Sequence, residues 1–255
     1  MEKRSGEKGV VFIGAGNLAT CLSASMQEAG FDIIQVYSRT ATSASSLGCR
    51  LGCEWTDRLE AVRDDGDLYV FAVRDDALPE VIGGMRPNGG TWIHTSGCMP
   101  MEVFAGATEQ YGVIYPLQTF SKGRTISFAS IPLFIEGCSE ATSAALRAVA
   151  ERLSSEVHDL SSAQRRRLHP AAVFACNFTN RMYAVAFRLL EEQGLDGRLL
   201  LPLIDETAAK VHALHPTAAQ TGPMVRGDVK VMEDHLSMLA DETVREIYKA
   251  VSGMR

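Results

Sequence analysis

The sequence predicts an α/β fold in which a doubly wound, mostly parallel β-sheet is followed by an all-helical domain. Up to about residue 155, short apolar runs rich in Val, Ile and aromatic residues alternate with helix-like stretches, a pattern typical of parallel strands joined by helices on both faces of a sheet. From residue 161 onward only helical patterns remain. We therefore expect one domain over residues 1–157 and a second over residues 158–255.

Six apolar runs are the predicted strands of the sheet. In order they read "GVVFIG", "DIIQVYS", "DLYVFAV", "GTWIHTS", "YGVIYPL" and "SIPLFIEG". Helices are expected after the first three, over residues 17–29, 41–51 and 77–85, where the apolar spacing changes to that of a helix.

In the second domain, helices are expected over residues 161–193, 197–214, 228–239 and 241–251. Ser161 and Gln164 have the spacing of a capping box at the start of the first of them. Pro170 lies inside this helix, where its missing N–H should kink the helix or start it afresh. The basic run at residues 165–167 is expected at the surface.

The composition of the 255 residues narrows the classes of partner. A content of 46% hydrophobic and 22% charged residues is ordinary for a globular protein, and the net charge of −6 argues against a nucleic-acid or anionic-membrane surface. The six cysteines form no CxxC pair and have no histidine at zinc-ligand spacing, so no disulfide framework or metal site is expected. Residues 1–9 are polar, and the apolar run after them is too short for a signal peptide or a membrane span. We expect a cytoplasmic protein that binds a small molecule.

The motif "GAGNLA", residues 14–19, follows the first predicted strand and opens a helix. In this context the first glycine allows a tight turn, the second lets the backbone approach a pyrophosphate, and the final alanine packs the helix on the strand. The motif predicts a Rossmann-like dinucleotide-binding domain, with an ordinary glycine-containing bend as the alternative. The residues expected at the phosphates are Gly14, Ala15, Gly16, Asn17 and Leu18.

The end of the second strand indicates which dinucleotide is bound. An NAD site usually has an acidic residue there, whereas this sequence has Ser38, Arg39 and Thr40. A guanidinium pairs with phosphate through two parallel hydrogen bonds, so these residues favour NADP(H), which carries a 2′-phosphate. The alternative is that Arg39 is a solvated loop charge.

Two further strand ends should meet the cofactor, because ligands of open α/β sheets lie beyond the carboxyl ends of the strands. Val73, Arg74 and Thr95 are expected to contact it, and Asp75 to line the same pocket; the alternative for Arg74 and Asp75 is a surface turn. Ser96 offers a hydroxyl to the reaction. His94 either acts as an acid near neutral pH or is a strand-end histidine whose nitrogens bind the backbone.

Seven segments together resemble one family, over nearly the whole chain. They are residues 14–19, "YSRT", "FAVRDDALPEV", "HTSG", "YPLQTFSKG", "HPAAVFACNFTNRMY" and "TGPMVRGD". The family comprises NADP oxidoreductases with a Rossmann-like N-terminal domain and a helical C-terminal domain of unknown function. More distantly, the layout is similar to that of pyrroline-5-carboxylate reductase and the β-hydroxyacid dehydrogenases.

The resemblance implies a helical domain that builds a homodimer and a substrate that binds between the two domains. It also exposes a departure. β-Hydroxyacid dehydrogenases carry a catalytic lysine four residues before an asparagine, and here Val173 stands four residues before Asn177. The missing lysine favours imine or enamine reduction over alcohol oxidation.

The remaining site candidates are polar residues of the family-like segments. Asn177 and Tyr115 are expected near the reacting carbon, with His169 as a weaker candidate. Gln118 and Asn180 are expected to bind substrate, or else to join neighbouring elements. Arg226 suits a substrate carboxylate, or an internal pair with Asp228, which should cap the next helix.

The sequence thus predicts an NADP(H)-dependent oxidoreductase that transfers hydride to or from a small imino or carboxylate-bearing substrate. One alternative is a non-catalytic regulatory or sensor protein that binds NADP(H). Another is a helical interaction module with a vestigial nucleotide fold.

Overall fold

The structure is a computed structural model that describes residues 9–254. The expectation that no signal peptide precedes the first strand falls on residues outside this range, apart from Gly9. The chain divides into two compact units, Met1–Ala175 and Cys176–Arg255. This division lies within the helical region, because the first helix of that region is bonded to the sheet. The boundary expected after residue 157 stays a prediction.

The first unit is built on one eight-stranded sheet of order β3-β2-β1-β4-β5-β6-β7-β8. Neighbouring strands pair in parallel except β6 and β7, so the expected doubly wound, mostly parallel fold is confirmed. The strands are β1 (Gly9–Ile13), β2 (Asp32–Tyr37), β3 (Glu54–Thr56), β4 (Leu68–Phe71), β5 (Thr91–His94), β6 (Tyr111–Pro116), β7 (Leu133–Gly137) and β8 (Val157–Asp159).

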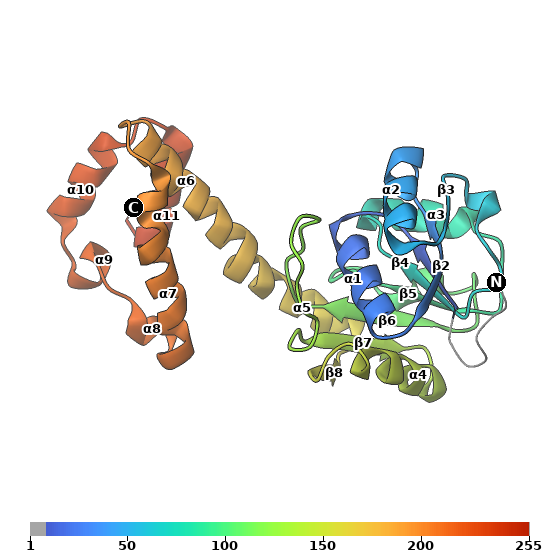
Figure 1. The fold of residues 1–255 in the computed structure, drawn as a ribbon. Helices are drawn as coiled ribbons and strands as arrows, with labels where there is room; N and C mark the ends of the chain where they lie inside the picture. The colour runs from blue at the N-terminus through green and yellow to red at the C-terminus, as the bar shows by residue number, and fades with distance from the viewer. Residues whose placement is uncertain (1–8, 255) are drawn as a thin grey trace. The chain divides into compact units, whose positions relative to one another are not determined.

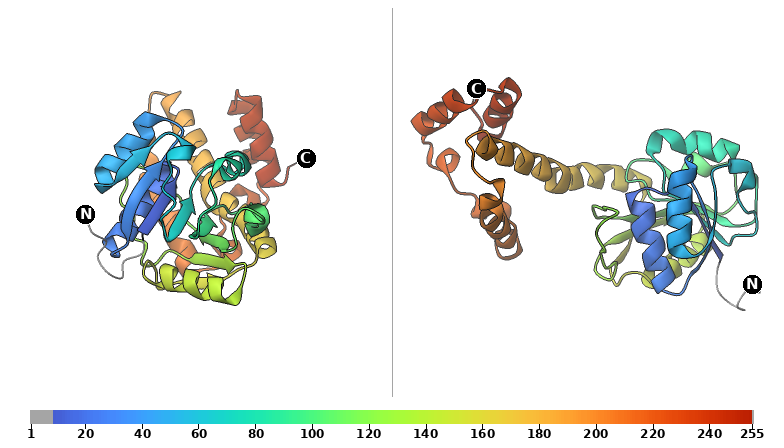
Figure 2. Two further views of the ribbon diagram at one scale, coloured as in Figure 1. Left: turned by 90° about the vertical axis from the view of Figure 1, so that its right-hand side faces the viewer. Right: turned by 45° about the horizontal axis from the view of Figure 1, so that its top comes forward.

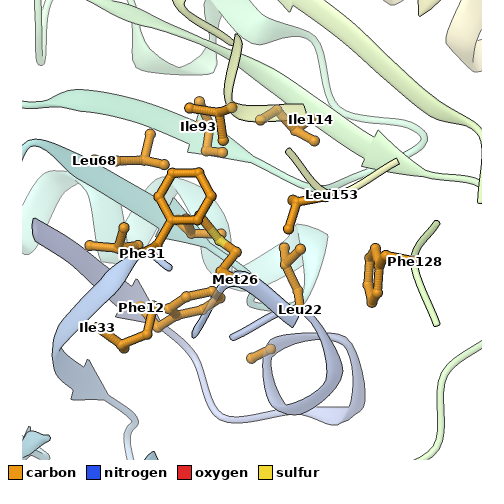
Figure 3. Packing of buried hydrophobic residues seen from close by; sticks show 14 of the residues in the cluster. Phe12, Leu22, Met26, Phe31, Ile33, Leu68, Ile93, Ile114, Phe128 and Leu153 are labelled. Carbon is orange, nitrogen blue, oxygen red and sulfur yellow. The ribbon is translucent and has the colours of Figure 1, made fainter. Parts of the chain in front are cut away.

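One face of the sheet is covered by α1 (Asn17–Glu28), α2 (Ala41–Leu51) and α4 (Glu140–Glu151) (Figure 1). Phe12 of β1 and Ile33 of β2 alternate with residues of the opposite face and pack against Leu22 and Met26 of α1 (Figure 3). Ala19 is fully buried in the same cluster, where its small side chain lets α1 lie close to the sheet.

The other face packs against α3 (Leu78–Gly84) and the short 3-10 turns η1 (Leu59–Ala61) and η3 (Met101–Phe104), while a third such turn, η2 (Asp75–Ala77), leads into α3. Its centre is aromatic: the rings of Phe71 and Trp92 lie 5.2 Å apart and those of Phe71 and Phe104 lie 5.0 Å apart. Burial on both faces explains why these strands read as continuous apolar runs.

The helical region starts at α5 (Ser162–Ala172), which opens with the predicted Ser161–Gln164 capping box. The helix neither stops nor restarts at Pro170. It continues to Ala172 and then widens into a π-helical segment, η4 (Val173–Phe178), before α6 (Thr179–Glu191). Pro170 removes one backbone hydrogen-bond donor from the helix. π-Helical segments inside α-helices often lie at functional sites.

The surface position expected for the run at residues 165–167 is wrong for its first member. The Arg165 side chain is only 1% exposed. Its charge is satisfied by partners far away in sequence, which include Glu136 on β7. Arg166 and Arg167 are exposed.

The second unit, as far as residue 254, consists of helices and loops (Figure 2). After α6 come η5 (Gly197–Leu200), α7 (Leu201–Ala213), α8 (Pro216–Ala219), α9 (Pro223–Arg226), α10 (Val229–Met238) and α11 (Glu242–Ser252). The one-turn helices α8 and α9 were not expected, and each begins with a proline. In the described part of the chain, no helix is both long and apolar enough to span a membrane.

Candidate functional site

A cavity of about 540 Å³ lies at the carboxyl ends of four neighbouring strands of the first unit. Its walls come from the residues that directly follow β1, β2, β4 and β5. β1 is the switch point of the sheet, because the chain moves from it to β2 on one side and β4 lies on its other side. Ligands of open α/β sheets bind at such a point.

The floor of the cavity is the turn between β1 and α1. Gly14 has φ +121°, and a Cβ there would overlap the backbone oxygen of Ala72. Gly16 is the N-cap of α1, and a Cβ on it would meet nothing within 4 Å. The first turn of α1 carries no acidic side chain, so its free N–H groups face the cavity without a competing negative charge.

The wall beyond β2 holds the residues that were expected to bind the 2′-phosphate, Ser38, Arg39 and Thr40, together with Ser43 of α2. Arg39 is exposed, and no ion pair engages it within residues 9–254. The guanidinium therefore has its full hydrogen-bonding capacity available for a ligand.

The wall beyond β4 contains Val73 and Arg74. Arg74 lines the cavity, but its Nη2 lies 2.6 Å from an Asp76 carboxylate oxygen and its side chain is 80% exposed. Arg74 is thus both a cavity residue and part of a surface turn, with its charge already balanced.

The wall beyond β5 contains Thr95 and Ser96. The Ser96 hydroxyl accepts hydrogen bonds from the backbone N–H groups of Cys98 and Met99, at 3.0 and 2.9 Å. Since a hydroxyl has two acceptor positions and one donor, what remains to Ser96 is its O–H donor.

His94 is 1% exposed, and both of its ring nitrogens are bonded. Nδ1 accepts from the Ser96 N–H at 3.1 Å, and Nε2 lies 3.2 Å from the Pro100 carbonyl, to which it must donate. Burial lowers the pKa of His94 to about 4, helped by the nearby Arg165 charge. These contacts correspond to the backbone-bound alternative, and they leave no ring nitrogen for the other alternative, the role of an acid.

Tyr115 and His169 meet beside Gly97, the residue that follows Ser96. The Tyr115 hydroxyl lies 3.1 Å from Nδ1 of His169. A Cβ on Gly97 would overlap that same nitrogen and lie 3.1 Å from Cζ of Tyr115, so glycine is required for the pair to approach the backbone. Burial raises the pKa of Tyr115, which keeps its hydroxyl protonated at neutral pH.

Arg165 holds the loop after β5 in place. Its Nε donates to the Ser96 carbonyl at 3.0 Å, Nη2 donates to the Met99 carbonyl at 2.6 Å, and Nη1 lies 2.8 Å from Glu136 Oε2. Burial alone would raise the pKa of Glu136, but hydrogen bonds from Ser162 and Arg165 outweigh it and hold that pKa below its usual value.

The cavity lining contains all eleven residues expected at the cofactor, and Ser96 with them; of the other candidates in the first unit, His94, Tyr115 and Gln118 do not line it. Gln118 is exposed, and its Oε1 accepts from the Thr119 N–H at 2.8 Å. Asn177 in η4 and Asn180 in α6 are exposed and belong to the second unit. Arg226 is paired with Asp228 at 2.8 Å, the alternative left open by the sequence. Asp228 is the N-cap of α10 but makes no side-chain cap bond.

Six cavity residues were not expected: Tyr37, Ser43, Ala72, Ala77, Val81 and Lys122. Five of them lie near the predicted strand ends and follow from those ends. Lys122 comes from the loop between β6 and β7, and its position depends on how that loop folds back. Among residues 9–254, no three His, Cys, Asp or Glu side chains gather as metal ligands would.

The glycine turn at the switch point of a parallel sheet places the first unit in the class of Rossmann-like nucleotide-binding domains. Comparison with known families agrees. Residues 9–93 match the family described as "NADP oxidoreductase coenzyme F420-dependent", and residues 131–254 match a domain of unknown function, DUF2520. A "putative NADP oxidoreductase" from Bacteroides fragilis is 46% identical, with 96% of each chain covered and a TM-score of 0.91. The chain belongs to this family of NADP oxidoreductases, for which NADP(H) is the cofactor.

Two more distant solved structures share the fold. A Thermotoga maritima protein is 21% identical over 96% of this chain and 98% of its own, with a TM-score of 0.78. The 1-pyrroline-5-carboxylate reductase of Streptococcus pyogenes is 12% identical over 97% of both chains, with a TM-score of 0.65. A comparison with curated proteins gives no match. The family resemblance drawn from the motifs is confirmed.

Proposed function

We propose that this protein is an NADP(H)-dependent oxidoreductase whose substrate is a small imine or carboxylate-bearing compound. The observation that carries the proposal is the cavity, which has the glycine turn as its floor, Arg39 on the wall beyond β2, and Thr95 and Ser96 on the wall beyond β5. Bound there, the nicotinamide would supply or accept the hydride. The residues of the chain would bind the cofactor, orient the substrate and transfer the proton.

The residues present fit such a cofactor. The open side of Gly16 leaves room for a diphosphate against the N-terminus of α1. Arg39, free of carboxylates within residues 9–254 and flanked by two hydroxyl residues, would bind the 2′-phosphate. The end of β5, with Thr95 and Ser96, would then face the nicotinamide.

For the proton, the geometry supports Tyr115 better than His94. The Tyr115 hydroxyl carries a proton at neutral pH and is hydrogen-bonded to Nδ1 of His169, which holds it in place. Ser96 would donate to the substrate or the nicotinamide amide. We assign His94 the role of positioning Ser96, because its Nδ1 accepts from the Ser96 N–H.

The proposed substrate class rests on the missing lysine and on the likeness to a reductase whose name specifies a pyrroline carboxylate. Val173 cannot shuttle a proton, and a protonated imine does not require that shuttle. Asn177, Asn180, Gln118 and Arg226 stay predicted substrate contacts, and the position of the substrate between the domains stays a prediction with them.

Cofactor titration by calorimetry tests the proposal. Arg39→Ala should weaken NADPH by about 10- to 100-fold and leave NADH nearly unchanged, since a hydrogen bond to a charged group contributes about 1.5–3 kcal/mol. Arg58→Ala is the matched control, because Arg58 is an exposed arginine outside the cavity lining. Equal losses for both cofactors would contradict the 2′-phosphate role, and no binding of NADPH by the wild type would contradict the proposed function.

Turnover is then measured with imino acids, keto acids and hydroxy acids while NADPH absorbance is followed. Tight binding of NADPH without turnover of any of these three substrate classes would favour the sensor alternative. The expected cytoplasmic location is tested by cell fractionation.

We also propose that the helical unit forms a homodimer. Among its described residues, Met232, Leu236 and Val244 are the large apolar side chains that are buried. Many others are exposed, including Leu199, Leu203 and Met238 at 66%, 63% and 74%. A groove of about 1050 Å³ lined largely by apolar side chains runs along α6, α10 and α11. Apolar surface on this scale is typical of an interface.

A further inference from the structure

We propose that Lys122 binds the diphosphate of the dinucleotide, a role separate from that of Arg39 at the 2′-phosphate. This inference rests on the proposed binding of NADP(H) in the cavity. The motif "FSKG" that contains Lys122 had no assigned function in the sequence.

The cavity lining holds three cationic side chains, Arg39, Arg74 and Lys122, and one carboxylate, Asp75. Arg74 is neutralised by the two hydrogen bonds that it makes to Asp76. No ion pair engages Lys122 within residues 9–254. Two cations without an ion-pair partner therefore line a cavity whose proposed ligand carries phosphate in two places, the diphosphate and the 2′-phosphate.

The two cations come from different elements: Arg39 from the end of β2, and Lys122 from the loop between β6 and β7. Arg39 follows β2, on the wall where a 2′-phosphate is expected. Lys122 belongs to the turn Ser121–Arg124, which is closed by a hydrogen bond from the Arg124 N–H to the Ser121 carbonyl at 3.0 Å. This turn contacts α1, because Cys21 Sγ lies 3.8 Å from the Ser121 carbonyl and 3.9 Å from that of Arg124.

Apolar packing holds the turn against α1. The Phe120 ring stacks on the buried Phe128 with centroids 5.5 Å apart, and Ile126 packs against the same core as Leu18. Phe120 and Ile126 thus anchor the two ends of this loop segment on the core, and Lys122 lines the cavity together with Asn17 and Leu18 of the first turn of α1. That turn is where the helix N–H groups would bind a diphosphate. A lysine there adds the positive charge that α1 lacks in its own sequence near its start.

The test compares NADPH, NADH and 2′-AMP as calorimetric probes of the full-length protein. The diphosphate is common to both dinucleotides and absent from 2′-AMP. Lys122→Ala should weaken NADPH and NADH by the same factor, about 5- to 50-fold, and leave 2′-AMP unchanged. Arg39→Ala should weaken NADPH and 2′-AMP but not NADH. Lys122→Arg should recover most of the affinity, because it restores the charge.

Arg124→Ala is the matched control: it removes the same charge from the same turn, but Arg124 does not line the cavity. Lys122 is exposed, so its variants should unfold at the wild-type temperature. Unchanged affinities in Lys122→Ala, or a loss confined to NADPH, would overturn the diphosphate role and leave the proposed function standing. A wild type that binds neither dinucleotide would overturn both.

Discussion

The hydroxyl of Tyr115 and Nδ1 of His169 lie 3.1 Å apart, although 54 residues separate them in the chain. β6 carries the tyrosine and α5 carries the histidine, and both rings close over Gly97. The loop beneath them is held by Arg165, which comes from the same helix as His169. One helix thus supplies both the hydrogen-bond partner of Tyr115 and the support for the cavity wall beside it.

The first prediction concerns this pair. Tyr115→Phe should keep NADPH affinity and lower turnover of the best panel substrate by about 10²–10⁴-fold, the usual contribution of a general acid. Because burial raises the pKa of Tyr115, wild-type activity should decline only at alkaline pH, and Tyr115→Phe should lack that decline. Tyr111→Phe, at the other end of β6, is the control. A Tyr115→Phe variant with the wild-type turnover rate would contradict the role of Tyr115 as proton donor. The NMR chemical shift of the His169 ring nitrogens reports independently on the hydrogen bond between His169 and Tyr115.

The second prediction concerns acid stability. The pKa of His94 is about 4 in the folded protein and about 6.5 when unfolded. Protonation therefore favours unfolding: the stability is complete above pH 6.5 and falls by up to about 3 kcal/mol as the pH is lowered toward 4. Glu136, whose pKa is also lowered, adds a further loss below its ordinary value of about 4.3.

Urea unfolding at a series of pH values measures this slope. His94→Gln should remove the pH dependence of the unfolding free energy between pH 6.5 and 4, because the amide does not titrate. A His94 ring that titrates near pH 6.5 in NMR spectra would show that the buried neutral state is not maintained.

The third prediction concerns the Arg165–Glu136 pair. Arg165→Ala leaves a carboxylate that is only 14% exposed without its cation, and two backbone carbonyls without their donor. We expect a loss of about 3–5 kcal/mol in the free energy of unfolding, the usual cost of breaking a buried pair from one side. Arg166→Ala removes a neighbouring exposed charge and should change it by less than about 0.5 kcal/mol. Equal effects of the two variants would mean that Arg165 does not anchor the loop.

The lining of the cavity in the first unit could be predicted from the sequence because it consists largely of strand ends. Apolar runs fix where β1, β2, β4 and β5 end, and parallel strands bring those ends to one edge of the sheet. Ser38, Val73 and Thr95 could therefore be grouped without knowing any tertiary contact. β3 and β8 were missed because each has only three residues, too few for a recognisable period.

Side chains whose position depends on long-range packing were predicted poorly. Arg165 lies in a run of three arginines, and only its distant partners, Glu136 and the carbonyls of Ser96 and Met99, distinguish it from its neighbours. The position of Lys122 depends on the stacking of Phe120 on Phe128. The two alternatives for His94 were separable only by its burial and by the Pro100 carbonyl six residues away.

The last prediction concerns the homodimer. Met238 ends α10, lines the apolar groove of the helical unit and is 74% exposed. Met238→Glu would place a charge in an interface that must be dry to be stable, and an uncompensated buried charge is costly. In sedimentation experiments we expect a dimeric wild type and a mainly monomeric Met238→Glu variant. Trp55→Glu, an exposed apolar residue on β3 of the other unit, should stay dimeric. A monomeric wild type at micromolar concentration would contradict the homodimer, while NADPH binding by the same sample would show that the cofactor site forms without it.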